Sequence, residues 1–178
     1  YHQIKHDNIM VVGSGWSIEQ YKDDILNLIQ QMGFKTIGIN CMTSLCVPDY
    51  HLWTNRKQFS RLGGCICPTK SVLLLGCNIP QKVVSQHHKG KYISVKYSDG
   101  DKYKTRPVFD SYHIKGRFRT AGCLGIVLAY LMEAKNIIIV GMDGFTLYDK
   151  KSLLNSNNNQ HCYGRGYTDD ADWQTCIL

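Results

Sequence analysis

Apolar residues recur along the chain with two spacings, which predict alternating strands and helices. Short, continuously apolar runs are typical of buried strands, and they span residues 8–13, 34–40, 48–55, 71–76 and 136–143. Apolar residues at helical spacing predict a helix after the first run, and they are Ile18, Tyr21, Ile25, Leu28, Ile29 and Met32. A strongly apolar helix is predicted over residues 119–135. Because the strands are continuously apolar, we expect an α/β fold with a mostly parallel sheet and helices on both faces.

Turn and cap residues predict where these elements begin and end. Ser17 is expected to cap the first helix, and Gly33 is expected to end it. Within residues 92–109, an Asp-Gly pair predicts the turn of a small hairpin insertion. A polar, Asn-rich loop is predicted at residues 150–160, and a last helix is predicted from residue 167 onward.

Length and composition predict one domain. The chain has 178 residues and is 43% apolar, which is enough for one hydrophobic core. No uninterrupted apolar run reaches the roughly 18 residues of a membrane span, and the polar N-terminus lacks a signal pattern. The sequence begins at Tyr1 and ends inside the predicted last helix. We therefore interpret residues 1–178 as a single domain from a longer protein that is cytoplasmic or peripheral on the inner membrane.

The charge of the chain favours anionic partners. It has 21 basic and 14 acidic residues, a formal net charge of +7. The basic residues are concentrated between Lys82 and Arg106. This segment is interpreted either as a solvated basic hairpin or as a contact with an acidic membrane surface or a phosphoglycolipid acceptor.

Cysteines and acidic clusters are the candidate metal ligands, but their spacing favours other roles. None of the eight cysteines has the Cys-x-x-Cys spacing of a zinc ribbon, so we expect a reduced, cytoplasmic protein. Asp99 and Asp101 belong to the predicted turn, and residues 168–172 are typical of an acidic helix start. We therefore predict no metal and no cofactor, with an Asp-x-Asp metal site for a sugar nucleotide as the alternative.

A glycine turn follows the first predicted strand. Gly13 and Gly15 match the first two glycines of a dinucleotide fingerprint, but Ile18 occupies the third position. The second strand ends in Asn40, where a ribose-binding acidic residue is required. NAD and FAD are therefore not expected. A tight turn that leads into a helix presents backbone N–H groups to an anion, which fits a phosphate or nucleotide. A plain tight turn is the alternative.

Polar residues follow other predicted strands at the same edge of the sheet. Asn40 and Asn55 end the second and third strands, and Asp143 follows the last one. An amide has both donor and acceptor groups, which suits a base edge or sugar hydroxyls. Each asparagine taken alone is also typical of a turn.

His161 is the candidate proton acceptor. Its sequence neighbours are polar, and an imidazole with a pKa near 6.5 can accept a hydroxyl proton at neutral pH. Tyr148, Tyr163 and Arg165 are near it in sequence and are expected to donate hydrogen bonds to a departing phosphate.

The ordered motifs resemble those of bacterial family 42 sialyltransferases, on a scaffold that recurs in proteins related to 6-hydroxymethylpterin diphosphokinase. In chain order, the motifs are VVGSGWSI, GIN, LWTN, RTAGCLGIVLAYL, IIIVGMD and HCYGRGYTDDA, and the similarity covers residues 8 to about 173. The resemblance implies a Rossmann-like fold of modified GT-A type. It also implies that CMP-sialic acid is the donor, with inversion at the anomeric centre and no metal.

The resemblance also implies a donor site. The family's opening motif Gly-Asn-Gly-Pro-Ser-Leu falls on residues 13–18, with Ser14 in place of a donor-contacting asparagine. The family's Thr-Ser-Gly has Ala121 in place of its serine, and its Gly-Ile-Asp falls on residues 141–143. The implied nucleotide-binding residues are Gly13, Ser14, Gly15, Asn40, Asn55, Thr120, Ala121, Gly122 and Asp143.

The catalytic histidine of the family falls on His161, which implies that His161 is the general base. The family holds the donor phosphate with two tyrosines; Tyr148 is the candidate match for one, and Arg165 or Tyr163 substitutes for the other. The predicted partners are a CMP-sugar, a glycan or glycolipid acceptor, an anionic membrane surface and, in a homo-oligomer, a second copy; nucleic acid is not among them.

The predicted function is therefore that of a sialyltransferase-like glycosyltransferase in surface glycan assembly. Two alternatives stay open. One is Mg²⁺-dependent pyrophosphoryl transfer on the related scaffold, with Asp143, Asp169 or Asp170 as metal ligands. The other is a non-catalytic domain that binds a nucleotide sugar or a glycan.

Overall fold

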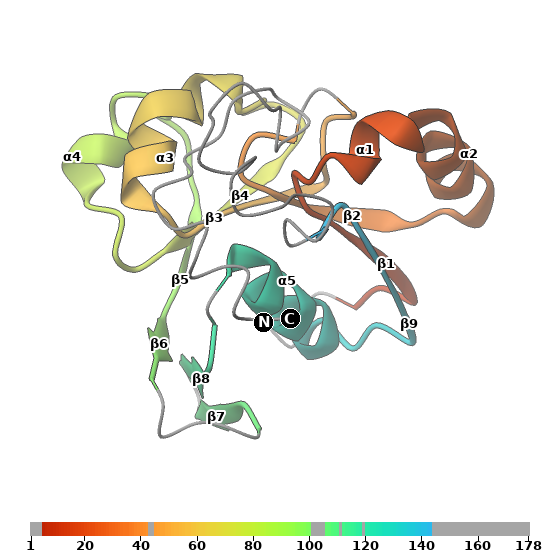
Figure 1. Ribbon diagram of the computed structural model, residues 1–178. Coiled ribbons are helices and arrows are strands. Elements are labelled where there is room, and N and C mark those ends of the chain that lie inside the picture. The colour runs from red at the N-terminus through yellow and green to blue at the C-terminus, as the bar shows by residue number, and fades with distance from the viewer. Residues whose placement is uncertain (1–4, 43–44, 101–105, 111, 119, 144–178) are drawn as a thin grey trace, which may run out of the picture.

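A computed structural model describes residues 5–42, 45–100, 106–110, 112–118 and 120–143. Its main sheet has six strands in the order β5-β4-β3-β2-β1-β9, and all neighbouring strands are parallel (Figure 1). The strands are β1 (Asn8–Val12), β2 (Lys35–Ile39), β3 (Tyr50–Trp53), β4 (Val72–Gly76), β5 (Ile93–Val95) and β9 (Asn136–Val140). The predicted α/β fold with a parallel sheet is confirmed.

Helices cover both faces of this sheet. They are α1 (Ser17–Gln20), α2 (Lys22–Met32), α3 (Arg56–Leu62), α4 (Gln81–Val84) and α5 (Ala121–Leu131), with a 3-10 turn at Gly63–Cys65. Along β1, Ile9 and Val11 pack in the cluster that contains α5, whereas Met10 and Val12 pack with residues of α1 and α2. On this second face, α3 and α4 cover β3 and β4. The alternation of side chains along a strand thus divides the core into two layers.

The first helical segment is interrupted. The single helix expected from Ser17 is two helices, because the backbone at Tyr21 (φ −114°, ψ 24°) leaves the helical region between α1 and α2. Gly33 ends α2 in the left-handed conformation with φ +63°, which confirms the predicted end.

A second sheet lies apart from the main one (Figure 1). Its strands are β6 (Tyr97–Asp99), β7 (Val108–Asp110) and β8 (His113–Gly116), in the order β6-β8-β7. The hairpin predicted at Asp99–Gly100 is wrong, because β6 pairs in parallel with β8 and a tight turn joins only antiparallel neighbours. The antiparallel hairpin is formed by β7 and β8 instead.

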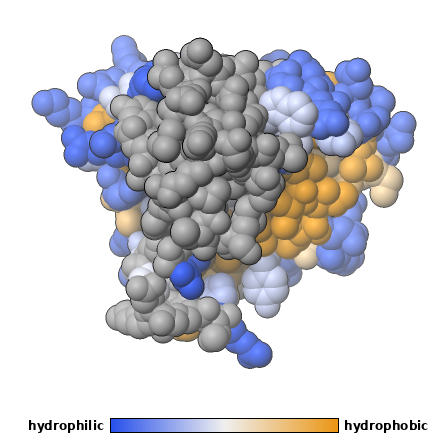
Figure 2. Space-filling model, in the orientation of Figure 1, coloured by the Kyte–Doolittle hydropathy of each residue, from blue (hydrophilic) through white to orange (hydrophobic). Residues whose placement is uncertain are grey.

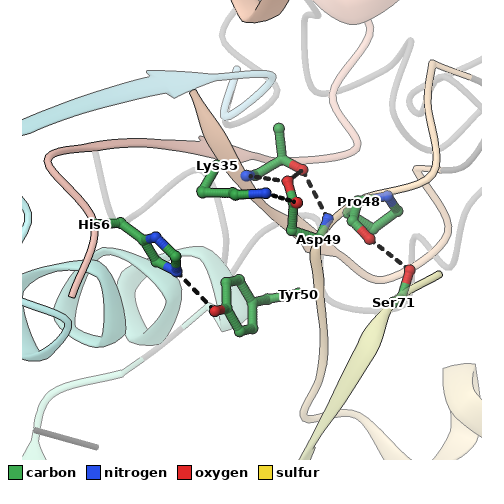
Figure 3. Close-up of polar contacts among 7 residues, drawn as sticks. His6, Lys35, Pro48, Asp49, Tyr50 and Ser71 are labelled. Atoms are coloured by element: carbon green, nitrogen blue, oxygen red, sulfur yellow. Dashed lines mark hydrogen bonds and ion pairs between the residues drawn. The ribbon is translucent and has the colours of Figure 1, made fainter. Parts of the chain in front are cut away.

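Polar contacts tie the amino ends of β2, β3 and β4 together (Figure 3). Asp49 accepts hydrogen bonds from Lys35 Nζ (2.7 Å), Thr36 N–H (3.0 Å) and Thr36 Oγ1 (3.0 Å), and Ser71 Oγ donates to the Pro48 carbonyl (2.5 Å). Burial alone would raise the pKa of Asp49, but the hydrogen bonds from Lys35 and Thr36 outweigh it and lower that pKa. This network fixes strand positions at the edge opposite to the predicted ligand-binding residues.

The predicted loop at residues 150–160 and the predicted last helix from residue 167 lie outside the described residues. Within the described part of the chain, no helix combines the length and apolar character needed to cross a membrane.

Candidate functional site

The order of strands in the main sheet reverses at β1. From β1 the chain proceeds outward through β2, β3, β4 and β5, and it returns to the other side of β1 only with β9. The segments that follow β1 and β9 therefore start side by side at the carboxyl edge of the sheet. In parallel α/β sheets, ligands bind in the crevice at such a reversal. The Gly13–Ser17 turn and the Gly141–Asp143 segment meet at this point.

The two loops contact each other through their backbones. Gly13 N–H donates to the Val140 carbonyl (2.8 Å), and Gly15 N–H donates to the Gly141 carbonyl (2.8 Å). A Cβ atom on Gly13 would lie 2.2 Å from the Gly141 oxygen. Gly141 itself has φ +68°. The glycines are thus required by the close approach of two backbone segments that are far apart in sequence.

Asp143 caps the first helix. Its carboxylate accepts hydrogen bonds from Ser17 N–H (2.7 Å) and from Ser17 Oγ (2.5 Å). Ser17 is the first residue of α1, and Trp16 is the N-cap, without a side-chain cap hydrogen bond. The prediction that the Ser17 side chain caps the helix is therefore wrong: its hydroxyl donates to Asp143 instead. A carboxylate at this end is favoured by the exposed N–H groups of the first turn.

These contacts change the explanation of the glycine turn. The sequence predicts N–H groups that are free to meet an anion, whereas those of Gly13, Gly15 and Ser17 already have acceptors in the protein. Ser14, between the two glycines, is 8% exposed. The N–H groups of Gly13, Gly15 and Ser17 are therefore not available to an anion.

A cavity of about 390 Å³ lies beside the capped helix. It is lined by Ser17, Tyr21, Ile25, Ile139, Val140, Gly141, Met142 and Asp143. Figure 2 shows an apolar area on this side of the molecule, over the edge strand β9. The cavity thus combines an apolar wall with the carboxylate of Asp143 and the hydroxyl groups of two residues, a composition typical of small-molecule sites.

Asn40 directly follows β2 in a left-handed conformation, with φ +55°. Its N–H donates to the Leu52 carbonyl (3.0 Å), and its own carbonyl accepts from His51 Nε2 (2.5 Å). The side-chain oxygen Oδ1 is buried and has no hydrogen-bond partner in the described part of the chain. An unpaired buried acceptor costs about 1–3 kcal/mol, so a donor group of a ligand would be favoured there.

Asn55 and Thr120 begin helices. Asn55 Oδ1 accepts from Gln58 N–H (3.1 Å) as the N-cap of α3, and Thr120 Oγ1 accepts from Cys123 N–H (3.3 Å) as the N-cap of α5. Both side-chain oxygens therefore have a structural role. In Asn55, the amide nitrogen is the side-chain group that could donate a hydrogen bond to a ligand.

The start of α5 contacts the segment after β9. A Cβ atom on Gly122 would lie 2.6 Å from Met142 Sδ, so α5 approaches this segment closely. Ala121, the residue before Gly122, is the first residue of α5. The structure thus brings together the glycine turn, residues 120–122 and Asp143, while Asn40 and Asn55 follow neighbouring strands of the same edge. Tyr148, His161, Tyr163, Arg165, Asp169 and Asp170 lie outside the described residues.

Sequence reasoning did not single out His51. This residue lies in β3 with 0% exposure, and its Nδ1 has no hydrogen-bond partner within the described residues. Because the Asn40 carbonyl can only accept, Nε2 carries the proton. Burial lowers the pKa of His51, and the hydrogen bond to Asn40 partly opposes this effect. The only signal in the sequence was a histidine within an otherwise apolar run.

The lowered pKa of His51 predicts that the folded state loses stability in acid. The unfolded chain takes up a proton near pH 6.5, whereas folded His51 resists protonation, so its contribution is fully present above pH 6.5 and is lost as the pH falls toward the folded pKa. One such group changes the free energy of unfolding by at most about 1.4 kcal/mol per pH unit. Urea unfolding across this range, with His51→Gln for comparison, should show a smaller acid loss in the variant. Equal losses would contradict the assignment.

No group of three or more His, Cys, Asp or Glu side chains within the described residues is arranged to hold a metal ion. The described cysteines are all free thiols, and they are Cys41, Cys46, Cys65, Cys67, Cys77 and Cys123. Asp143 is a candidate metal ligand in the alternative function of Mg²⁺-dependent pyrophosphoryl transfer. Both of its carboxylate oxygens accept hydrogen bonds from Ser17.

Fold and site together define an α/β protein whose candidate ligand site lies at the carboxyl edge of a parallel sheet, where the strand order reverses. No protein-family model matches the chain, and no curated protein matches it significantly.

Proposed function

We propose that this protein is a glycosyltransferase that moves sialic acid from a CMP-activated donor to a glycan acceptor. The observation that carries the proposal is the reversal of strand order at β1. At the edge where this reversal occurs lie the residues through which the chain resembles family 42 sialyltransferases. They are the Gly13–Ser17 turn, Asn40, Asn55, residues 120–122 and Asp143.

The proposed cytidine contacts use the two asparagines. The exocyclic amino group of cytosine is a hydrogen-bond donor. Asn40 Oδ1 is a buried acceptor to which no described residue donates a hydrogen bond. The amide nitrogen of Asn55 is a donor for the carbonyl oxygen of the base or for a sugar hydroxyl. Because Gly13, Gly15 and Ser17 use their N–H groups within the protein, the proposed phosphate contacts come from Tyr148, Tyr163 and Arg165.

The proposed reaction is a direct displacement. His161 takes the proton from the acceptor hydroxyl, whose oxygen forms the new bond to the anomeric carbon. The bond between this carbon and the phosphate oxygen breaks, and CMP leaves with the electron pair. The negative charge that develops on the phosphate is stabilised by hydrogen bonds from Tyr148 and Arg165. A metal ion is not required for any of these steps, so EDTA should leave the release of CMP unchanged.

Variants of the two asparagines that respect their structural roles test the cytidine contacts. Asn40→Gly removes the amide and tolerates φ +55°, whereas Asn55→Asp keeps the N-cap acceptor and removes the amide donor. We expect each to weaken CMP binding by about 1–3 kcal/mol, because a buried partner loses its hydrogen bond. Titration calorimetry measures the change, and Asn27→Asp on the exposed side of α2 is the matched control. Unchanged affinity in both asparagine variants would contradict the site.

Turnover separates this function from its alternatives. Release of CMP from CMP-sialic acid that survives EDTA supports the proposal. Activity with a nucleoside triphosphate that EDTA abolishes would instead indicate pyrophosphoryl transfer. CMP binding without turnover on any acceptor would indicate a binding domain.

A further inference from the structure

Exposed apolar side chains gather at the second sheet (β6-β8-β7), which we call the small sheet, and at the neighbouring helix α5. Of the ten large apolar residues that are exposed in the described part of the chain, four lie here: Val108 (50%), Phe109 (40%), Tyr112 (78%) and Tyr130 (66%). The rings of Phe109 and Tyr130 stack with their centroids 6.3 Å apart and their planes at 27°. We call these four residues the aromatic rim.

Packing of the core does not account for the aromatic rim. In the β7–β8 hairpin, Phe109 lies opposite Ile114, which is 2% exposed and belongs to the main core. Phe118, just after β8, is 8% exposed and packs in the same cluster. These two residues anchor the small sheet to the core, so the rim residues remain in contact with solvent at an energetic cost.

Basic residues are frequent in the segment of the sequence that forms the small sheet. Residues 96–117 contain six Lys or Arg and three Asp. Lys115 is neutralised by Asp110 at 3.0 Å. Lys96, Arg106 and Arg117 are exposed, and none of them has an ion pair with a described residue. The small sheet and the residues that flank its strands thus combine exposed apolar rings with exposed cations.

This combination fits the interface of an anionic bilayer. Aromatic rings are favoured at the level of the lipid headgroups, and each nearby Lys or Arg adds attraction to anionic lipids. Figure 1 shows the small sheet projecting from the body of the molecule. A projection can enter a flat membrane surface, whereas single-stranded nucleic acids are bound in basic grooves.

We propose that the small sheet β6-β8-β7 docks this protein on an anionic lipid bilayer. Val108, Phe109, Tyr112 and Tyr130 enter the headgroup region, and Lys96, Arg106 and Arg117 contact the phosphates of anionic lipids. The inference rests on the described surface and does not depend on the proposed glycosyltransferase function.

Co-sedimentation of the full chain with vesicles tests the charged contacts. Vesicles of phosphatidylcholine with phosphatidylglycerol should bind the protein at low salt, and pure phosphatidylcholine should bind it far less. Binding should fall as salt rises, because screening acts within about 10 Å at 0.1 M. Arg106→Gln and Arg117→Gln should each weaken binding about five-fold. Lys57→Gln and Lys70→Gln, at exposed positions away from the rim, should leave binding unchanged.

Two variants at the most exposed ring test the apolar contact. Tyr112→Ser should weaken vesicle binding, whereas Met32→Ser, at a residue with 55% exposure elsewhere, should not. Tyr112→Trp should bind like the wild type. Brominated lipids should quench its fluorescence more than that of the wild type, whose three tryptophans lie at other positions. Because Tyr112 is 78% exposed, neither change should alter the free energy of unfolding.

Several outcomes would overturn the proposal. One is no binding to anionic vesicles at low salt, and another is equal binding by the rim variants and their controls. A dimer in sedimentation equilibrium that Tyr112→Ser dissociates would assign the rim to a second copy of the chain. Tighter binding of a single-stranded oligonucleotide than of anionic vesicles would assign it to nucleic acid. None of these results depends on whether the protein binds CMP.

Discussion

Gly13→Ala should destabilise the fold by about 3 kcal/mol or more. The new Cβ atom would lie 2.2 Å from the Gly141 oxygen and 2.8 Å from its carbonyl carbon. These are backbone atoms, so no side-chain rotation relieves the clash. Gly13 cannot move away without losing its hydrogen bond to the Val140 carbonyl. Relief therefore requires the loops after β1 and β9 to separate, which also disrupts the candidate site.

Gly64→Ala is the matched control for this prediction. Beyond its own chain neighbours and the backbone of its own turn, no described atom lies within 4 Å of a Cβ placed on Gly64, and its φ is not positive. Its replacement should change the free energy of unfolding by no more than about 0.5 kcal/mol, or should stabilise slightly through the unfolded state. Urea unfolding monitored by circular dichroism compares the two variants. Equal stability of both would contradict the close approach of the two loops.

His161→Ala should lower turnover about 10²–10⁴-fold, because the proposed reaction loses its general base. Donor affinity should change little, since the base acts on the acceptor. In the wild type the rate should rise with pH through the ordinary imidazole pKa near 6.5, and this rise should be absent in the variant. Initial rates of CMP release between pH 5 and pH 8 measure both effects.

His113→Ala is the control for the catalytic histidine, because His113 lies in β8 of the small sheet and not at the carboxyl edge of the main sheet. It should keep both the turnover and the pH profile of the wild type. A folded His161→Ala variant with wild-type turnover would exclude His161 from catalysis. A His161→Ala variant that does not fold would make the residue structural, and His161→Gln would then test catalysis in a variant of similar size.

The layers of the fold were predictable from local patterns. Continuous apolar runs indicated strands buried on both faces, and these runs became the strands of a parallel sheet. Gly33 ends α2 in the left-handed conformation that its position predicted. Such features depend on residues close in sequence, so a single sequence contains the information that specifies them.

Contacts between distant segments were not predictable in this way. Ser17 and Asp143 are separated by 126 positions, and no local pattern indicates that one holds the other. The Asp-Gly pair at positions 99–100 resembles a hairpin turn, but the partner of β6 is a parallel strand. The burial of Asn40 Oδ1, which has no hydrogen-bond partner among the described residues, likewise depends on the packing of β2 against β3. These contacts decide how the glycine turn, Asp143 and Asn40 contribute to the candidate site.

Titration calorimetry of the chain with CMP, CDP, ATP, GTP and NAD, with and without EDTA, tests the proposed function most directly. The proposed CMP-sugar site predicts that CMP binds more tightly than ATP, GTP or NAD and that EDTA leaves its affinity unchanged. No binding of CMP, or a preference for ATP that EDTA abolishes, would contradict it.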